Sequence, residues 1–434
     1  MTDKTEIAAM ESYFQRLWPI MRSITGHGVR QSHDILSELV PFERFEVPTG
    51  TKCFDWIVPK EWVCREAYVI APGGRRILDI RENTLHLLNY SIPFRGRMTL
   101  AELDKHLFSL PEIPDAIPYK TSYYSPRWGF CLSHQMREGL QDGIYEVVVD
   151  TDHIDGSLTI SQAILPGETA DEVLISTYTC HPSMANNELS GPLVSAFLYR
   201  RLALLPRRRL TYRFVFLPET IGSITFLSMF GTHLLEKLVA GFVVSCVGDA
   251  RPFTYMKSRR GDTIADRAAQ VVLTKRTDNL FHLLDFDPNG SDERQYCSPG
   301  FNLPVGVIAR ALYGEFREYH TSLDNRDFIS FEAMSNSVDV CFEICHTIDR
   351  NLTYCRTMPF CEPQLGRRGL YESVGGVQVT EERAKTLLWL LNLADGEHDL
   401  IRMAVRSKMP FDLFHELAET CVKAGLLKSV NKSL

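Results

Sequence analysis

Apolar strand-like segments alternate with helical segments through the middle of the chain, and this alternation limits the fold more than any other feature. The nearly continuous apolar runs are typical of strands covered on both faces. They span 173–178, 212–217, 239–247 and 305–309. Helical patterns follow at 190–204, 221–238, 263–272 and 331–348. Because parallel strands need crossover helices, the sequence predicts an α/β core with a mostly parallel, mixed sheet flanked by helices.

The segments before this core have a different pattern of apolar residues. A helical pattern runs from Ile7 to Met21, and a second short helix is predicted around Ser32 to Leu39. Between residues 43 and 150, short alternating runs are separated by Pro and Gly, which is typical of an antiparallel β-rich module. The predicted strands of this module include 44–47, 56–58, 67–71, 76–80 and 84–88.

The end of the chain predicts a small helical module that is similar to a winged helix. Its expected helices are 381–393, 397–405 and 410–424. Between Glu381 and Leu434, eight Lys and Arg residues balance eight Asp and Glu residues, so we do not expect nucleic-acid binding. An appended module of this kind suggests a role in packing or a homo-oligomer. The expected domains are a core of 1–42 and 151–350, an insert at 43–150, and a C-terminal module at 351–434.

The cysteines and the N-terminal sequence indicate the cellular compartment in which we expect the protein. The chain has 11 cysteines and none forms a C-x-x-C pair, which is unlike a zinc knuckle or a disulfide framework. Unpaired thiols in apolar runs are typical of a reducing compartment. The first residues are charged rather than apolar, and no apolar run reaches the roughly 18 residues of a membrane span. We therefore expect a cytoplasmic protein without a membrane segment.

Polar residues that bind metals and move protons follow the predicted strands. His181, Glu219 and Asp249 come after successive strands, and His320 lies in a later loop. Because the carboxyl ends of parallel strands meet at one edge of a sheet, these side chains can converge. His, Asp and Glu are the ligands of catalytic zinc, and a carboxylate beside the metal can act as a general base. Taken singly, each residue also fits a structural role, such as a helix-end acid or a loop histidine.

The motifs around these residues resemble the zinc-dependent aminopeptidases, whose relatives include glutaminyl cyclases and the transferrin-receptor ectodomain. More closely, nearly the whole chain is similar to a bacterial aminopeptidase-like family found near polysaccharide biosynthesis, with a β-rich insert and a C-terminal winged helix. The segments that carry the resemblance are 180–191 (CHPSMANNELSG), 217–223 (LPETIGS), 257–261 (KSRRG), 290–296 (GSDERQY) and 319–322 (YHTS). The resemblance implies a zinc-aminopeptidase-like core fold.

The resemblance also implies roles for individual residues. His181, Asp249 and His320 match metal ligands, and Glu219 matches the general base. Asn187 stands where the wider family has an aspartate that bridges two metals. Two further departures are Thr220 in place of a ligand glutamate and Ser183 in place of an aspartate that orients the first histidine. We therefore expect one Zn²⁺ rather than two, held by His181, Asp249 and His320 with Asn187 beside them, unless Glu188 supplies a second site.

A hydrolase of this kind also needs residues that bind its substrate. Carboxylates such as Asp292, Glu293 or Asp324 can bind a free α-amine, and Arg260, Arg127 and Tyr296 can bind a carboxylate or a developing oxyanion. The aromatic turn at 123–130 is a candidate lid over the pocket.

The function expected from these features is that of a mono-zinc aminopeptidase or amidase. Its substrate would be small and peptide-like or aminoacyl, with an amide bond as the target. Two alternatives stay open: a cyclase or acyltransferase on the same fold, and a non-catalytic binding or scaffold protein whose metal site has been lost. The missing ligands favour the second alternative, and the metal content of the purified protein distinguishes it from an enzyme.

Overall fold

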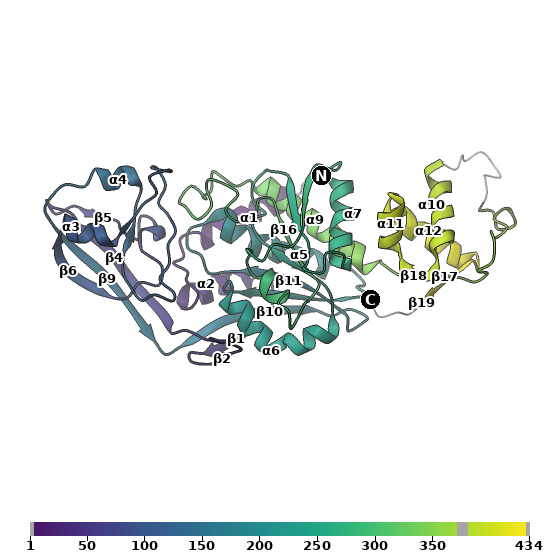
Figure 1. Ribbon diagram of the computed structural model, residues 1–434, viewed down its shortest axis with the longest axis horizontal. Coiled ribbons are helices and arrows are strands. Elements are labelled where there is room, and N and C mark those ends of the chain that lie inside the picture. The colour runs from purple at the N-terminus through teal and green to yellow at the C-terminus, as the bar shows by residue number, and fades with distance from the viewer. Residues whose placement is uncertain (1–3, 371–380, 431–434) are drawn as a thin grey trace.

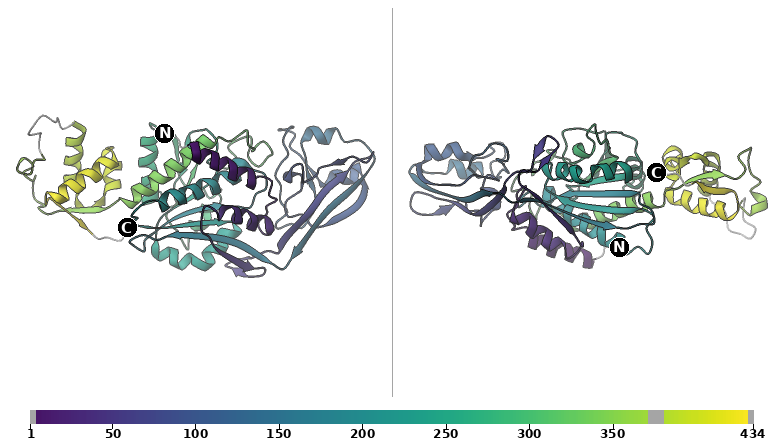
Figure 2. Two further views of the ribbon diagram at one scale, coloured as in Figure 1. Left: turned by 180° about the vertical axis from the view of Figure 1, so that it is seen from behind. Right: turned by 90° about the horizontal axis from the view of Figure 1, so that it is seen from below.

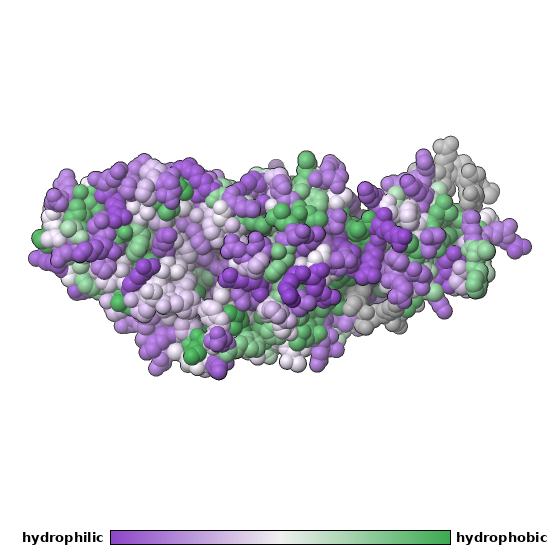
Figure 3. All heavy atoms as spheres, viewed as in Figure 1, coloured by the Kyte–Doolittle hydropathy of each residue, from purple (hydrophilic) through white to green (hydrophobic). Residues whose placement is uncertain are grey.

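The computed structural model describes residues 4–370 and 381–430, and Figure 1 shows them as three bodies in a row. The α/β core lies in the middle. The β-rich segment lies at one end and the C-terminal helices at the other. Figure 3 shows hydrophilic side chains over most of this face of the molecule, with hydrophobic side chains in separate patches.

The core is built on a mixed sheet. Among the described residues, its strand order is β1-β10-β12-β11-β13-β16-β14-β15. The neighbouring strands β12, β11, β13 and β16 run parallel. Strand β10 pairs antiparallel with both β1 and β12, and β14 pairs antiparallel with β16 and parallel with β15. The bounds are β1 Glu43–Pro48, β10 Ser157–Leu165, β11 Glu172–Tyr178, β12 Thr211–Leu217, β13 Leu238–Val244, β14 Phe253–Met256, β15 Phe281–Leu284 and β16 Val305–Ala309. This arrangement confirms the predicted α/β class.

Helices cover both faces of this sheet. In β11, Val173 and Ile175 pack into one hydrophobic cluster and Leu174 packs into the other, because successive side chains of a strand point to opposite faces. The first face is covered by α1 Lys4–Leu17, α2 His27–Leu36, α5 Ser190–Ala203, α7 Ile264–Arg276 and α9 Phe331–Asp349. The opposite face is covered by α6 Ile221–Lys237 and the short α8 Glu293–Tyr296 (Figures 1 and 2).

The inserted segment forms a separate antiparallel sheet in the order β5-β4-β9-β6. Two predictions fail in this region. Residues 84–88 do not form a strand, because Asn83 caps a short 3₁₀ turn at Thr84–His86. Strand β1, predicted within the insert, pairs with β10 in the core sheet instead. The other elements are β2 Lys52–Cys53, β3 Trp56–Ile57, β4 Glu61–Ile70, β5 Arg76–Ile77, β6 Phe94–Thr99, α3 Leu100–Leu103, β7 Leu107–Phe108, β8 Phe130–Cys131, α4 His134–Glu138 and β9 Ile144–Ile154.

The C-terminal module contains the predicted helices and a small sheet in the order β18-β17-β19. Its elements are β17 Thr353–Arg356, α10 Glu381–Leu393, β18 Asp395–Asp399, α11 Leu400–Ser407, α12 Phe411–Lys423 and β19 Leu427–Val430. Asp412 at the start of α12 forms ion pairs with Lys275 of α7 and Arg350 of the core, both at 2.8 Å. Across the described ranges, no helix has the length and hydrophobicity needed to cross a membrane.

Candidate active site

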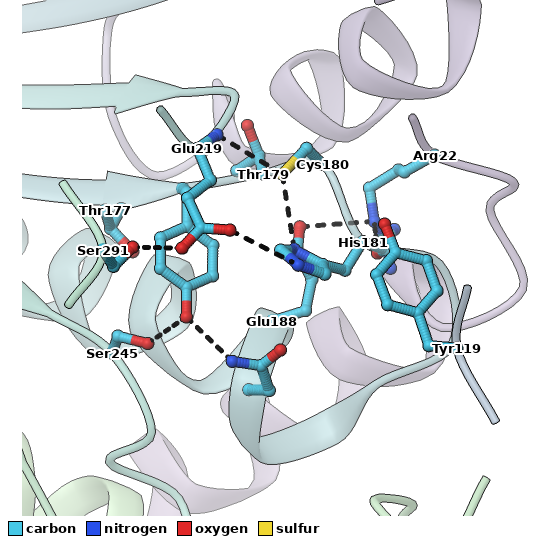
Figure 4. A network of polar contacts seen from close by, with 12 residues as sticks. Arg22, Tyr119, Thr177, Thr179, Cys180, His181, Glu188, Glu219, Ser245 and Ser291 are labelled. Atoms are coloured by element: carbon cyan, nitrogen blue, oxygen red, sulfur yellow. Dashed lines mark hydrogen bonds and ion pairs between the residues drawn. The ribbon is translucent and has the colours of Figure 1, made fainter. Parts of the chain in front are cut away.

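The candidate site lies at the carboxyl ends of β11 and β12 (Figure 4). After β11 the chain passes through Cys180 and His181 and enters a π-helical turn at Ala185–Leu189, which runs directly into α5. This turn places Glu188 beside His181, which lies seven positions earlier in the chain. The Glu188 Oε2 atom lies 3.0 Å from the His181 Nδ1 atom, and the Cys180 Sγ atom lies 3.3 Å from the same nitrogen.

Cys180, His181 and Glu188 together have the donor atoms of a metal site. Sulfur, imidazole nitrogen and carboxylate oxygen are all zinc ligands, and here one such atom from each residue lies within 4.8 Å of the others. Among the residues that the structure describes, this is the one group of three His, Cys, Asp or Glu side chains with such spacing. All three side chains are buried.

Arg22, a buried arginine from the N-terminal segment, contacts both His181 and Glu188 of this group. Arg22 has no exposed surface, and its Nε donates to the carbonyl oxygen of His181 at 2.8 Å. The same nitrogen lies 3.5 Å from Glu188 Oε1, which has no hydrogen-bond partner in the described ranges. Burial disfavours a charged imidazole, but Cys180 and Glu188 outweigh burial and raise the pKa of His181 well above its ordinary value.

Glu219, the predicted general base, lies on the other side of the imidazole. It follows β12, where Thr220 has a φ of 62° and turns the chain into α6. The Glu219 Oε2 atom lies 3.6 Å from His181 Nε2, its Oε1 accepts a hydrogen bond from Ser291, and its backbone N–H donates to Cys180 Sγ at 3.3 Å. Its side chain is 28% exposed, whereas that of His181 is 5% exposed. Solvent or a substrate therefore reaches Glu219 more easily than it reaches His181.

Two more carboxylates lie behind Glu219. Asp292 Oδ1 accepts hydrogen bonds from the Thr220 N–H and the Ser223 hydroxyl, both at 2.7 Å, and Glu293 Oε1 accepts one from the Ser291 N–H at 2.8 Å. Both side chains are fully buried. Burial and the nearby charge of Glu219 raise the pKa of Asp292 to about 8, and mainly burial raises the pKa of Glu293 to about 7.

His320 lies next to His181 but is not part of the compact group. The two imidazole rings are 5.4 Å apart, and the Nε2 atom of His320 is buried without a hydrogen-bond partner among the described residues. Burial and the neighbouring His181 lower the pKa of His320 to about 3, so this ring is neutral. Its backbone φ of 54° is in the left-handed region, and the Tyr119 N–H donates to its carbonyl oxygen at 2.7 Å.

The inserted segment contacts the site through Tyr119. Its ring lies 5.0 Å from the His181 ring and 5.2 Å from the His320 ring, and its hydroxyl bonds that of Tyr123 at 2.7 Å. Pro118 forms a β-bridge with Thr321, next to the loop histidine. The predicted aromatic lid at 123–130 therefore reaches the site through its first residue, Tyr123.

The structure does not assemble the predicted ligand set of His181, Asp249 and His320 into a compact site. Both carboxylate oxygens of Asp249 are bonded to Arg251, at 2.9 and 3.1 Å, and one also accepts a hydrogen bond from Asn186 at 2.9 Å. The Asn187 side-chain N–H₂ group donates to the Tyr178 hydroxyl at 2.9 Å, and that hydroxyl also bonds Ser245. The Asn187 Oδ1 atom is buried without a hydrogen-bond partner among the described residues, whereas an arginine neutralises Asp249.

The predicted substrate-binding residues lie in different surroundings. Asp292 is beside Glu219. Tyr296 is fully buried and its hydroxyl bonds Ser176 at 2.9 Å, so its side chain is not accessible to a substrate. Arg127 is exposed and lies over the Phe108 ring in the insert, and Arg260 is exposed. Asp324 accepts hydrogen bonds from two backbone N–H groups of the Ala185–Leu189 turn and stabilises that turn.

Sequence reasoning missed two residues that shape the site. Arg22 and Tyr119 come from segments far from His181 in the chain, and neither lies in a recognisable motif. For the group of Cys180, His181 and Glu188, the sequence spacing alone could have predicted the contact. A turn that leads into a helix can bring a side chain close to residues that precede the turn.

Comparisons with known proteins place the chain in a family. The model of a domain of unknown function, DUF4910, matches residues 11–351, and a winged helix-turn-helix model matches residues 352–429. A Clostridium acetobutylicum protein named for polysaccharide biosynthesis and an aminopeptidase-like domain is 43% identical over 416 residues, which cover 96% of this chain and 95% of that protein.

Solved structures show the same fold. A crystal structure of a Clostridium acetobutylicum protein described as a peptidase has a TM-score of 0.91 and 41% identity, and the match covers 98% of this chain and 97% of that one. A zinc aminopeptidase from Bacillus subtilis has a TM-score of 0.55 at 14% identity, and the match covers 80% of this chain and 95% of that one. At this identity, the likeness to the zinc aminopeptidase shows the fold alone.

Proposed function

Since the chain belongs to the DUF4910 family, whose model spans its core and insert, we propose that it is a metal-dependent hydrolase that cleaves an amide bond of a small peptide-like or aminoacyl substrate. The observation that carries this proposal is the position of Glu219. Its partly exposed carboxylate lies 3.6 Å from His181 Nε2, and its backbone N–H donates to Cys180 Sγ at 3.3 Å, so Glu219 borders the group with the donor atoms of a zinc site. A general base beside a bound metal is one arrangement that hydrolyses amides.

The residues present fit a single zinc ion. Two ligands bound tetrahedrally to one zinc are separated by about 3.4 to 3.6 Å, given ordinary zinc–ligand bond lengths. The observed separations of 3.3 Å between Cys180 Sγ and His181 Nδ1 and 3.0 Å between His181 Nδ1 and Glu188 Oε2 are close to these values. Glu188 also has a buried oxygen without a hydrogen-bond partner in the described part of the chain. We therefore assign Cys180, His181 and Glu188 as the ligands, in place of the predicted set.

Each neighbouring side chain has a role in this proposal. A bound zinc would polarise the substrate carbonyl and acidify water. Glu219 takes a proton from the attacking water and returns it to the nitrogen of the leaving amine, while Ser291 holds the other carboxylate oxygen in place. Arg22 fixes the His181 loop through its carbonyl oxygen, and the Tyr119 ring packs beside both histidines and limits access of bulk water.

The test is a metal count together with turnover of aminoacyl p-nitroanilides. We expect about one zinc per chain, and Glu219→Gln should lower kcat by about 10²- to 10⁴-fold while leaving the zinc content and the melting temperature unchanged. The matched control is Glu236→Gln, which alters an exposed glutamate on α6. Full turnover by Glu219→Gln would show that the role assigned to this residue is wrong.

A second candidate function is a non-catalytic binding protein, and one observation favours it. Of the side chains first expected to bind metal, Asp249 is neutralised by Arg251. A zinc content below about a tenth of an ion per chain after zinc supplementation would favour this function over hydrolysis. The eleven cysteines, all within the described ranges, carry free thiols, which supports a reducing compartment for either function.

A further inference from the structure

A cavity of about 600 Å³ lies between the α/β core and the C-terminal module, and it shares no residue with the candidate active site. Helices α7 and α9 line it from the core, and α10, α11 and the start of α12 line it from the module. Figure 1 shows α7 and α11 next to each other where these two bodies meet. Cavities of roughly 300–1,000 Å³ at the interface between two domains are common ligand sites.

Part of the cavity lining is apolar and comes from both bodies. The apolar residues belong to, or pack against, the hydrophobic cluster that continues from the core into the module: Val271, Val272, Ala404, Val405, Met409 and Phe411. An aliphatic side chain that enters the cavity leaves water for this apolar surface, and its burial favours binding.

Charged side chains also line the cavity, and two of them have no ion pair. Lys275 pairs with Glu343 and with Asp412, both at 2.8 Å, so these three side chains already have partners. Lys408 and Glu382 also line the cavity, are exposed, and form no ion pair with the residues that the structure describes. One positive and one negative charge are therefore free to pair with a ligand.

The backbone at Lys408 distinguishes this residue from an ordinary surface lysine. Lys408 is the C-cap residue of α11, with a φ of 59° and a ψ of 29°. Helices commonly end with glycine in this left-handed conformation, because a Cβ atom is unfavourable there. A lysine at this position costs conformational free energy, and residues with such a cost cluster at binding sites.

We propose that this cavity binds a small zwitterion with an apolar side chain, either a free α-amino acid or a dipeptide. The ligand carboxylate pairs with Lys408 and the ligand ammonium group pairs with Glu382, while the apolar side chain packs between Val271 of the core and Val405 of the module. The inference does not rest on the proposed hydrolase function. Because the ligand contacts both bodies, its binding strengthens the contact between the core and the module.

The test is calorimetric titration of small ligands into the full-length protein. L-leucine is compared with glycine, which lacks the apolar side chain, with L-leucinamide, which lacks the carboxylate, and with N-acetyl-L-leucine, which lacks the ammonium group. L-leucyl-L-leucine is titrated into Glu219→Gln, so that the proposed hydrolase activity does not consume it. We expect L-leucine or the dipeptide to bind about tenfold or more tightly than each of the three comparison ligands.

Variants of the two unpaired charges locate the binding. Lys408→Gly and Glu382→Gln should each weaken binding of the zwitterion by about tenfold or more, whereas Lys408→Arg should retain most of the affinity. Lys408→Gly should not lower the melting temperature, because glycine suits the left-handed backbone, so its loss of binding is not a loss of folding. The matched control is Lys423→Met, which removes an exposed lysine of the module outside the cavity and should leave the affinity unchanged.

Three results would overturn the inference. In the first, neither the amino acid nor the dipeptide binds. In the second, the amide or the acetylated form binds as tightly as L-leucine, which would show that the two charges do not recognise the ligand. In the third, Lys408→Gly and Glu382→Gln both retain the wild-type affinity, which would place the binding elsewhere, for example at the candidate active site.

Discussion

The ends of β11 and β13 reach the same edge of the core sheet, yet only the first forms a site with the donor atoms of a metal centre. After β11, Cys180 and His181 meet Glu188 of the following turn, and a fully buried arginine supports them. After β13, Asp249 meets Arg251 two residues later, and the arginine side chain is 38% exposed. Position at a strand end therefore brings residues together, but the two carboxylates differ in the oxygens they leave free: Glu188 Oε1 has no hydrogen-bond partner among the described residues, whereas both oxygens of Asp249 are bonded to Arg251.

The largest expected effect concerns the buried charge at the β11 end. Arg22→Met should destabilise the fold by about 3–5 kcal/mol, because Glu188 would remain as an unpaired buried charge. Denaturant unfolding measures the change, and adding Glu188→Gln should recover part of the loss. Arg16→Met is the control, since the Arg16–Glu38 pair is exposed and should contribute less than about 1 kcal/mol. Equal losses in the two single variants would show that the buried pair at the β11 end contributes no more than an exposed one.

The next prediction concerns metal affinity. Cys180→Ser and Glu188→Gln should each weaken zinc binding by about 100-fold or more, because each removes one of three assigned ligands and loss of a residue that only supports a ligand already costs about 10- to 100-fold. In the cobalt-loaded protein, Cys180→Ser should also remove the sulfur-to-metal absorption band in the near ultraviolet. Cys341→Ser, at a buried thiol in the hydrophobic core, is the matched control. Loss of zinc in His320→Ala with no loss in Cys180→Ser would instead support the ligand set first expected from the resemblance.

A third prediction uses the raised pKa of Asp292. Burial and the Glu219 charge raise this pKa from 3.8 to about 8, so the folded state holds a proton that the unfolded state has released. The stability contributed at this site therefore falls as the pH rises from about 4 to about 8. Asp292→Asn should remove that loss and raise the melting temperature at pH 8 by about 3 °C or more, with a smaller gain at pH 5. A gain in melting temperature that is independent of pH would contradict this account. The control is Asp285→Asn, which alters an exposed carboxylate.

The smallest effect is expected at the β13 end. Asp249→Asn should leave the zinc content unchanged and lower the free energy of unfolding by about 1–2 kcal/mol, because the buried side chain loses its charged hydrogen bonds to Arg251. Metal analysis and denaturant unfolding measure the two quantities. A fall in zinc content comparable to that of Glu188→Gln would place Asp249 among the ligands.

Local sequence patterns predicted most of the core. The apolar runs located β11, β12, β13 and β16, and helix α10 was predicted with the bounds that the structure has. Strands β10, β14 and β15 were not predicted, because they are short or mix polar and apolar residues at the margins of the sheet. The 84–88 segment alternates like a strand, but the Asn83 side chain bonds the Leu85 N–H and favours a turn.

The candidate site was predictable only in part. Placement after parallel strands was enough to bring His181 and Glu219 together, because both follow neighbouring strands in register. The arginine that supports His181 lies 159 positions away and could not be found from local spacing. The pairing of Asp249 with Arg251, in contrast, is a local contact between residues i and i+2. It was predictable from the opposite charges of these two neighbours in the sequence.

The β-bridge beside His320 has a consequence for how the molecule folds. Residues 117 and 322, which bond each other next to this bridge, are 205 positions apart in the chain. Closing so long a loop costs conformational entropy that only an already formed core can offset. We therefore expect this edge of the site to form late in folding, after the central sheet and the inserted sheet have each formed.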